Sequence, residues 1–418
     1  MKRIIGRLNP QDKNVNIWGA GFSGLVLGFY LKEMGYKVSI FERSNKVGGK
    51  IHTKKIPNGL VETGPNALYM NADGMDLLKH LQLTPLPASK KLKRFLMIDG
   101  KLQHPMQLGI LSKVVLNAHK KPPLISDGLT VADFFRPLIG ESNIQNFLTP
   151  VLGGIYATPA ENLHFKSIFY ELSRIAQFKS YWDFLGLILK LKKAKPRLEV
   201  SGSVSFEGGM QTFINRMADY LSSEIKLNYK ESFKIKGNTV ICTDAFTAAE
   251  LLKEAKPEFS TELSRIKYQP LCSTTVFTKH EIKPIRKAFG VLIPIQNGFK
   301  SIGVLNNKAI FPLNNENVYS YTFISRSKAN EGQIKEDIKS ISQNFDTGDI
   351  EHMEINHWET AIPVYDIQRH LSIKKLHLLG MKEDNLAIFG NYVAGISLRE
   401  MISAAKNFAH NPIDYKGD

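Results

Sequence analysis

Short apolar runs bounded by glycines alternate with helical periodicities near the start of the chain. Residues 15–18 (Val-Asn-Ile-Trp) and 37–41 are each typical of a buried strand. Between them, apolar residues recur from Leu25 to Leu31 with helical spacing, and Gly35 lies just past the last turn. The pattern predicts a strand, a glycine turn, a helix and a second strand, the order of a Rossmann-type α/β unit.

A similar pattern returns near the end of the chain. Residues 386–389 (Leu-Ala-Ile-Phe) form a short apolar run, which predicts a buried strand. A glycine turn follows, and from about residue 395 the spacing becomes helical. The residues expected on the buried face of this helix are Ile396, Met401, Ile402 and Ala405.

The glycine turn after the first strand carries a G-x-G-x-x-G pattern. Gly19 permits the tight turn, Gly21 lets backbone approach a pyrophosphate, and Gly24 lets the helix pack close to the sheet. The helix N-terminus offers free N–H groups and the positive end of its dipole to phosphates. Glu42 lies about 18 residues after Gly24, near the ~20 expected for an acid that binds ribose. The predicted dinucleotide contacts are Gly19, Ala20, Gly21, Phe22, Ser23, Gly24 and Glu42.

A second glycine turn follows the acid, at Gly48-Gly49-Lys50. This segment resembles the second fingerprint of the flavin amine oxidase superfamily, in which the Gly-Gly turn passes the pyrophosphate. Nicotinamide enzymes do not usually carry it, so the resemblance implies FAD rather than NAD. It extends the expected cofactor contacts to Arg43, Gly48, Gly49, Lys50, Gly64, Pro65, Asn66 and Ala67.

The C-terminal pattern matches this family as well. Its helix N-terminus would stabilise an anion such as the reduced flavin. A plain connection between a strand and a helix remains the alternative. The cofactor contacts expected there are Gly390, Asn391, Ile396, Ser397 and Leu398.

Segments in the middle of the chain sharpen the resemblance. Taken in order, they are similar to protoporphyrinogen and coproporphyrinogen oxidases, which oxidise a porphyrinogen to a porphyrin in haem biosynthesis. In that family, electrons pass from the substrate to flavin N5 and then to oxygen or a quinone. The matching segments are Arg94–Leu102, Leu152–Leu163, Glu207–Met210, Phe289–Pro294, Gly303–Leu305, Phe311-Pro312, Trp358–Tyr365 and Gly390–Gly395.

The resemblance also implies residues that bind the substrate. Arg94 matches an arginine that pairs with a propionate, a contact that suits the planar guanidinium. Without the resemblance, Arg94 would be a solvated charge in a basic run. Gly154 matches a position where backbone lies against the substrate, and no general base is implied. The apolar residues expected to sandwich the macrocycle are Leu292, Leu305 and Phe323.

The chain departs from the family pattern at three places. Ser325-Arg326 stands where Gly-Gly is frequent, Gln368-Arg369-His370 where Gly-His is usual, and Glu400-Met401 where an acid or arginine precedes cysteine. None of these departures touches the phosphate-binding glycines. They bear instead on the substrate pocket.

The formal net charge of +16 favours anionic partners, which include a membrane surface, nucleic acid and acidic small molecules. Stacking aromatic residues are not interleaved with the lysine clusters, which argues against nucleic acid. The sequence shows neither a signal peptide nor an apolar run of about 18 residues, so we expect a cytoplasmic protein with peripheral membrane contact. Cys242 and Cys272 form no C-x-x-C pair, which makes a metal site unexpected and predicts buried thiols.

We predict three units. Residues 1–88, 200–262 and 372–418 form the FAD-binding domain, residues 89–199 a helical insertion, and residues 263–371 a substrate domain with a mixed sheet. In the insertion, apolar runs at 106–116 and 184–189 lie beside cations, namely Lys190, Lys192, Lys193, Lys195 and Arg197. These runs suit helices on anionic lipid, on the inner face of the cell membrane. Helices packed against their own domain, or lining the substrate pocket, are the alternatives.

Three functions remain open at this point. The first is oxidation of protoporphyrinogen IX or coproporphyrinogen III, since Arg94 would serve a propionate of either. The second is an amine oxidase or a desaturase on the same fold. Amine oxidases usually have paired aromatic residues near the flavin, whereas Tyr392 offers at most one. The third is a porphyrin carrier that FAD stabilises without catalysis.

Overall fold

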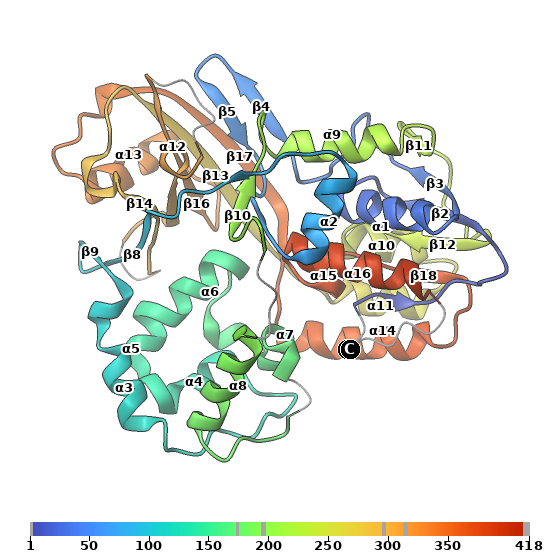
Figure 1. Ribbon diagram of the computed structural model, residues 1–418, viewed down its shortest axis with the longest axis horizontal. Coiled ribbons are helices and arrows are strands. Elements are labelled where there is room, and N and C mark those ends of the chain that lie inside the picture. The colour runs from blue at the N-terminus through green and yellow to red at the C-terminus, as the bar shows by residue number, and fades with distance from the viewer. Residues whose placement is uncertain (1–2, 173–174, 194–197, 295–297, 312–316, 413–418) are drawn as a thin grey trace.

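The computed structural model describes residues 3–172, 175–193, 198–294, 298–311 and 317–412. A six-stranded sheet, on the right of Figure 1, carries the strands from the two ends of the chain and is the side on which the sequence predicts cofactor binding. Its strands pair in parallel except for the first, which is antiparallel to its neighbour. In order across the sheet they are β1 (Ile5–Gly6), β18 (Leu386–Ile388), β12 (Asn238–Ile241), β2 (Asn14–Trp18), β3 (Lys37–Phe41) and β11 (Ile225–Lys226). The predicted strands near residues 15–18, 37–41 and 386–389 are therefore confirmed.

Helices cover both faces of this sheet. One core packs α1 (Phe22–Glu33), α2 (Ala72–His80), α9 (Met210–Tyr220) and α16 (Leu398–His410) against alternate residues of β2 and β3. The opposite core packs α10 (Ala245–Leu252), α11 (Pro257–Ser264) and α14 (Ile367–Gly380). The sheet is buried on both sides, as expected for parallel strands. Both cysteines are free and buried, as predicted.

A seven-stranded mixed sheet forms the second layer of the molecule, in the upper left of Figure 1. Its strand order is β17 (Ile350–Pro363), β13 (Tyr268–Thr278), β16 (Tyr319–Ser325), β15 (Ser301–Asn306), β14 (Ala288–Leu292), β8 (Lys93–Ile98) and β9 (Lys101–Gln103). One face packs on α13 (Glu331–Ile341). The expected helical insertion over 89–199 thus begins with two strands of this sheet, joined by a tight turn at Asp99-Gly100.

Smaller elements connect these layers. A hairpin pairs β4 (Thr53–Ile56) with β5 (Gly59–Glu62), and β10 (Ser203–Ser205) pairs with both β6 (Leu68–Tyr69) and β7 (Leu86–Pro87). Two short helices, α12 (Asn307–Ile310) and α15 (Asn391–Ala394), lie close to the predicted site segments.

The third region is helical and has its own apolar core. It contains α3 (Ile110–Asn117), α4 (Val131–Ile139), α5 (Glu141–Asn143), α6 (Thr149–Tyr156), α7 (Phe165–Ile168) and α8 (Tyr181–Lys193). These helices lie below the seven-stranded sheet in Figure 1, and α6 contacts β14 and β15.

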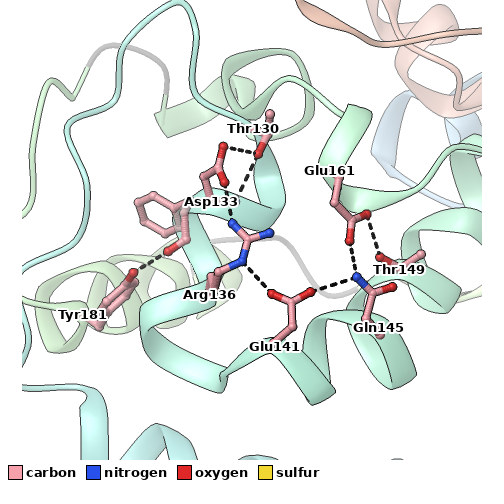
Figure 2. Close-up of polar contacts among 9 residues, drawn as sticks. Thr130, Asp133, Arg136, Glu141, Gln145, Thr149, Glu161 and Tyr181 are labelled. Atoms are coloured by element: carbon pink, nitrogen blue, oxygen red, sulfur yellow. Dashed lines mark hydrogen bonds and ion pairs between the residues drawn. The ribbon is translucent and has the colours of Figure 1, made fainter.

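Hydrogen bonds fix the position of α6 within this region (Figure 2). Arg136 on α4 pairs with Glu141, which accepts from Gln145, and Gln145 also donates to Glu161 at 2.6 Å. Glu161 in turn accepts from the Thr149 hydroxyl, the first residue of α6, at 3.3 Å. The chain of contacts runs from α4 through α5 to the start of α6 and to the turn that holds Glu161, and it orients the helix that faces the sheet.

The α8 segment packs on its own domain, one of the alternatives for the apolar run at 184–189. Tyr181 and Phe184 are buried, and Leu185 and Ile188 pack against the same core. Leu189 remains 59% exposed. Lys195 and Arg197 of the predicted basic run, and Pro312 of the Phe311-Pro312 match, lie outside the described residues.

Candidate functional site

Two glycine turns face each other at the carboxyl ends of β2 and β3. Gly21 and Gly48 form an isolated bridge, and a methyl group placed on Gly21 would lie 3.9 Å from Cα of Gly49. The backbone N–H of Gly48 donates to the Ala20 carbonyl at 2.8 Å. Gly19 adopts φ +107°, a conformation that side chains disfavour. The first and second fingerprints therefore form one backbone cradle.

The N-terminus of α1 opens into this cradle. Gly21 caps the helix in an extended conformation, and no side chain caps it within the described part of the chain. The N–H groups of the first turn, around Ser23, are thus available to phosphate oxygens. The Phe22 side chain belongs to the core, where its ring lies 5.9 Å from that of Phe213. These features fit the pyrophosphate of a dinucleotide.

Glu42 lies at the end of β3, beside the first glycine turn. Its carboxylate accepts hydrogen bonds from the N–H groups of Ala20 at 2.9 Å and Ser44 at 2.8 Å. The position matches that of an acid beside the ribose of the nucleotide. Arg43 is exposed on the loop that follows.

Residues after the second turn join the cofactor unit to the seven-stranded sheet. The Lys50 ammonium donates to the carbonyls of Thr360 and Ala361 on β17, the second at 3.0 Å, and lies over the Tyr268 ring. Burial lowers the pKa of Lys50 to about 8. The Trp358 indole donates to the Thr63 carbonyl at 2.6 Å. Both contacts hold the expected flavin segment against β17.

The segment from Gly64 to Ala67 runs between β5 and β6, next to the same sheet. A methyl group on Gly64 would lie 1.9 Å from the Lys50 carbonyl oxygen, so only glycine fits. Asn66 donates to Asn307, and Asn307 donates to the Thr322 hydroxyl on β16 at 2.8 Å. Pro65 is exposed. The predicted cofactor segment therefore reaches one face of the seven-stranded sheet through Asn307.

The C-terminal segment also lies on the cofactor side. Gly390 precedes α15, Gly395 adopts φ +116°, and Ser397 caps α16 without a side-chain hydrogen bond. The helix expected from about residue 395 thus begins at Leu398. Asn391 accepts a hydrogen bond at its carbonyl from the Tyr365 hydroxyl. The free N–H groups at the start of this 13-residue helix suit an anion.

One expectation for this helix is wrong. Ile396 precedes α16 rather than sharing its buried face, because Gly395 redirects the chain. Its side chain packs against the core of the helical region. The other three expected residues, Met401, Ile402 and Ala405, are buried as predicted.

Two residues that depart from the family pattern, Arg369 and Glu400, lie next to the C-terminal segment. Arg369 is buried, donates to the Tyr392 carbonyl at 2.8 Å, and lies 3.8 Å from the centre of the Tyr365 ring. Glu400 pairs with Arg3 at 3.6 Å. A crevice of about 830 Å³ opens here, and its walls include both residues and Ile396. Arg369 therefore helps to position the segment that precedes the α16 N-terminus.

The substrate residues expected on the second sheet divide between its two faces. Paired residues of neighbouring strands point to the same face. Leu292 pairs with Gly303, and Leu305 pairs with Thr322, which bonds to Asn307, the partner of Asn66 in the cofactor segment. A methyl group on Gly154 of α6 would lie 2.7 Å from Cδ2 of Leu292. This face, between α6 and the cofactor segment, thus brings Gly154, Leu292 and Leu305 together.

Phe323 lies on the opposite face, and its expected role at the macrocycle is wrong. It pairs with Val304, and both are buried in the core that contains Ile334 and Ile338 of α13. The residue on the α6 face is its neighbour Ile324, which is half-buried and pairs with Gly303. Neighbouring residues of a strand point to opposite faces of the sheet, so an error of one residue places a side chain on the wrong face.

Arg94 lies at the edge of the α6 face. It pairs with Gly290 on β14 and so shares the face of Leu305. The side chain is exposed, and its guanidinium stacks 4.4 Å from the centre of the Phe289 ring. The stacking orients a cation at the rim of the face, where a carboxylate could reach it.

Sequence reasoning missed three residues of this face: Asn307, Ile324 and Arg326. Arg326 follows β16, and a methyl group on Gly153 of α6 would lie 3.5 Å from its Nη2 atom. The departure at Ser325-Arg326 was visible in the sequence, but its orientation depends on the strand register.

Comparisons with known proteins agree with this arrangement. The family model for flavin containing amine oxidoreductase matches residues 22–232. Protoporphyrinogen oxidase 2 of Arabidopsis thaliana is 27% identical over 97% of this chain and 94% of its own. Coproporphyrinogen III oxidase of Bacillus subtilis is 26% identical over 55% of this chain and 53% of its own.

Solved structures share the fold. A protein from Exiguobacterium sp., provisionally named a protoporphyrinogen oxidase, superposes with a TM-score of 0.75 at 14% identity, over 95% of this chain and 98% of its own. Cyclohexylamine oxidase from Brevibacterium oxydans gives a TM-score of 0.66 at 14% identity, over 96% of this chain and 99% of its own. With the double glycine cradle, these matches identify the cofactor as FAD and the protein as an oxidoreductase. The chain belongs to the flavin-containing amine oxidoreductase family.

Proposed function

We propose that this protein oxidises a porphyrinogen to the porphyrin in haem biosynthesis. The observation that carries the proposal is the α6 face of the seven-stranded sheet. Leu292 and Leu305 form an apolar surface there, the backbone of Gly154 lies against Leu292, and Arg94 stands at the edge of the surface. A flat apolar macrocycle with carboxylate side chains suits such a surface. The relatives named protoporphyrinogen oxidase and coproporphyrinogen III oxidase support the same substrate class.

The residues of the chain act mainly by positioning. FAD, when bound, accepts the electron pair of each oxidation step, and the protein orients the substrate beside it. Asn307 links the substrate face to Asn66 in the cofactor segment, and Trp358 and Lys50 hold that segment against β17. Accurate placement of the reacting carbon contributes much of the rate. We assign no general base, and we propose oxygen or a quinone as the final acceptor.

Porphyrin fluorescence tests this proposal directly. The purified yellow protein is mixed with protoporphyrinogen IX and coproporphyrinogen III in parallel, and a flavin-free sample measures spontaneous oxidation. We expect fluorescence to grow faster than in that sample with at least one of them. Growth at the spontaneous rate, with flavin bound and an acceptor present, would favour an amine oxidase, a desaturase or a porphyrin carrier.

We also propose that α3 contacts an anionic membrane surface. Leu111, Val115 and Leu116 on this helix are 68%, 61% and 65% exposed, and Met106 just before it is 77% exposed. Lys113 lies among them. Exposed apolar side chains next to cations suit the interface of an anionic bilayer, on the inner face of the cell membrane. Among the described residues, no helix is both long and apolar enough to cross a membrane.

Sedimentation with lipid vesicles tests this contact. We expect binding to vesicles that contain phosphatidylglycerol and weaker binding to neutral ones. Replacement of Leu111 and Val115 by glutamate should abolish binding without loss of flavin, since both side chains are exposed. Equal sedimentation of this variant and the wild type would contradict the proposal.

A further inference from the structure

Arg326 places a second guanidinium on the substrate face. It follows β16 directly and lies two residues beyond Ile324, so the two side chains share one face. Its Nη2 atom lies close to Gly153, one residue before the glycine that contacts Leu292. The guanidinium thus sits between the sheet and α6, at the end of the apolar surface.

This guanidinium has no counter-charge within the described part of the chain. Its Nε atom is buried and has no hydrogen-bond partner, and no carboxylate of the described residues pairs with it. Burial alone moves its pKa, which falls below the usual value. Burial of an unpaired cation costs free energy that an anion at this position would recover.

Two other arginines, one buried and one half-buried, are already satisfied. Arg369 donates to a carbonyl and stacks on Tyr365, and Arg136 pairs with Asp133 and Glu141. The contrast indicates that Arg326 is built for a partner outside the chain.

The strand register separates Arg326 from Arg94 across the whole apolar surface. Arg94 lies in the row of Gly290, Leu305 and Thr322, and the next row contains Leu292, Gly303 and Ile324. Arg326 lies one row further. With strands ~4.8 Å apart and a rise of ~3.4 Å per residue, the two arginines are about 14 Å apart across the sheet and about 14 Å apart along it. They mark opposite corners of the surface on which the macrocycle would lie.

We infer that Arg326 binds a second carboxylate of the substrate, and that the preferred substrate is coproporphyrinogen III. The inference rests on the proposed porphyrinogen oxidation. Coproporphyrinogen III carries a propionate on each pyrrole ring, whereas protoporphyrinogen IX carries propionates only on two neighbouring rings. When Arg94 binds one propionate at its corner, coproporphyrinogen III still presents a carboxylate to Arg326 at the opposite corner. Protoporphyrinogen IX does not, because its two propionates lie on neighbouring rings.

Steady-state kinetics with both porphyrinogens test Arg326. The set comprises the wild type, Arg326→Met, Arg326→Lys and the control Lys328→Met, which removes an equal charge from a side chain that is 76% exposed. We expect Arg326→Met to raise KM for coproporphyrinogen III about tenfold, the effect of one charged hydrogen bond. KM for protoporphyrinogen IX should change less than about twofold. KM of Arg326→Lys for coproporphyrinogen III should lie between the values of the wild type and Arg326→Met. KM of Lys328→Met should equal that of the wild type.

A binding titration separates this inference from the proposed reaction. Quenching of porphyrin fluorescence gives Kd for coproporphyrin III and for its tetramethyl ester. The wild type should bind the acid about tenfold more tightly than Arg326→Met does, and the two proteins should bind the ester equally. If the wild type oxidises neither porphyrinogen but this difference persists, the proposed reaction fails and the carboxylate site stands. Equal KM and Kd for wild type and Arg326→Met, with full flavin in both, would overturn the inference.

Discussion

The cofactor cradle and the substrate face are built from different parts of the chain. The cradle is backbone: Gly21 and Gly48 approach each other, and the uncapped N-terminus of α1 opens between them. The substrate face is made of side chains from neighbouring strands, such as Leu292 and Leu305, and of α6 opposite them. A backbone site requires glycine at fixed positions, whereas a side-chain face requires a fixed strand register.

Substitution of the cradle glycines should have the largest effects on folding and on flavin binding. It also separates a glycine that the fold requires from one that the cofactor requires. In Gly24→Val, Cβ would lie 1.9 Å from the Gly19 carbonyl oxygen, so we expect loss of folded protein. In Gly21→Val, Cβ meets only Gly49 Cα at 3.9 Å, so we expect a folded protein without flavin. Circular dichroism and the flavin content per chain measure the two outcomes.

Gly186→Ala is the matched control, because a methyl group there meets nothing within 4 Å. It should keep both fold and flavin. Full flavin occupancy in Gly21→Val would contradict the assignment of the cradle.

Phe323 and Leu305 test the division of the second sheet into two faces. Phe323→Ala removes a buried ring from the core beneath α13 and should lower the free energy of unfolding by about 3–5 kcal/mol. KM of its folded fraction should not change. Leu305→Ala should raise KM for the porphyrinogen at a smaller cost in stability, because Leu305 is half-buried on the α6 face. A rise in KM for Phe323→Ala alone would return Phe323 to the substrate site.

A half-buried carboxylate in the cofactor unit, that of Glu62, should make stability depend on pH. Glu62 accepts from the Met210 N–H at 2.7 Å and from the Thr53 hydroxyl at 2.8 Å, yet burial raises its pKa to about 7. The raised pKa favours the protonated acid in the folded state. The stabilisation of the fold by protonated Glu62 is therefore fully present below the pKa of the unfolded state, near 4.5. It is lost as the pH rises through the folded-state pKa of about 7.

Denaturation at about pH 5 and about pH 8 measures the contribution of Glu62. We expect the wild type to lose about 2 kcal/mol more than Glu62→Gln over this range, after allowance for partial exposure. The glutamine still offers an oxygen to Met210, so the variant should fold. Identical pH profiles for the two proteins would show that Glu62 does not titrate in this range.

Arg94→Ala should affect substrate binding and leave the stability of the fold almost unchanged. Loss of one charged contact at an exposed edge is expected to weaken substrate binding by about 1.5–3 kcal/mol. KM should rise, whereas stability should change little because the side chain is exposed. The free energy of unfolding serves as the control, and an unchanged KM would exclude Arg94 from the site.

The sequence predicted the cradle well because glycine leaves a visible pattern. The strand, turn and helix at 15–33, the second turn at Gly48-Gly49 and the strand at 386–388 all lie where their residues indicated. The substrate face was predicted only in part. Phe323 and Ile324 are both apolar, and only the pairing of β16 with β15 decides which of them meets the substrate. Arg326 faces α6 for the same reason, which a single strand cannot reveal.

Anaerobic reduction of the bound flavin by a porphyrinogen tests the central claim most directly, because it needs no external acceptor. The flavin-loaded protein is mixed with excess coproporphyrinogen III, and the yellow absorbance is followed with time. We predict rapid bleaching, because each flavin accepts one electron pair from a porphyrinogen, and slower bleaching in Arg326→Met at low substrate concentration. Porphyrin should accumulate only after an acceptor is admitted, because its formation removes more than one electron pair from each porphyrinogen. A flavin that stays oxidised with both coproporphyrinogen III and protoporphyrinogen IX would contradict porphyrinogen oxidation by this protein.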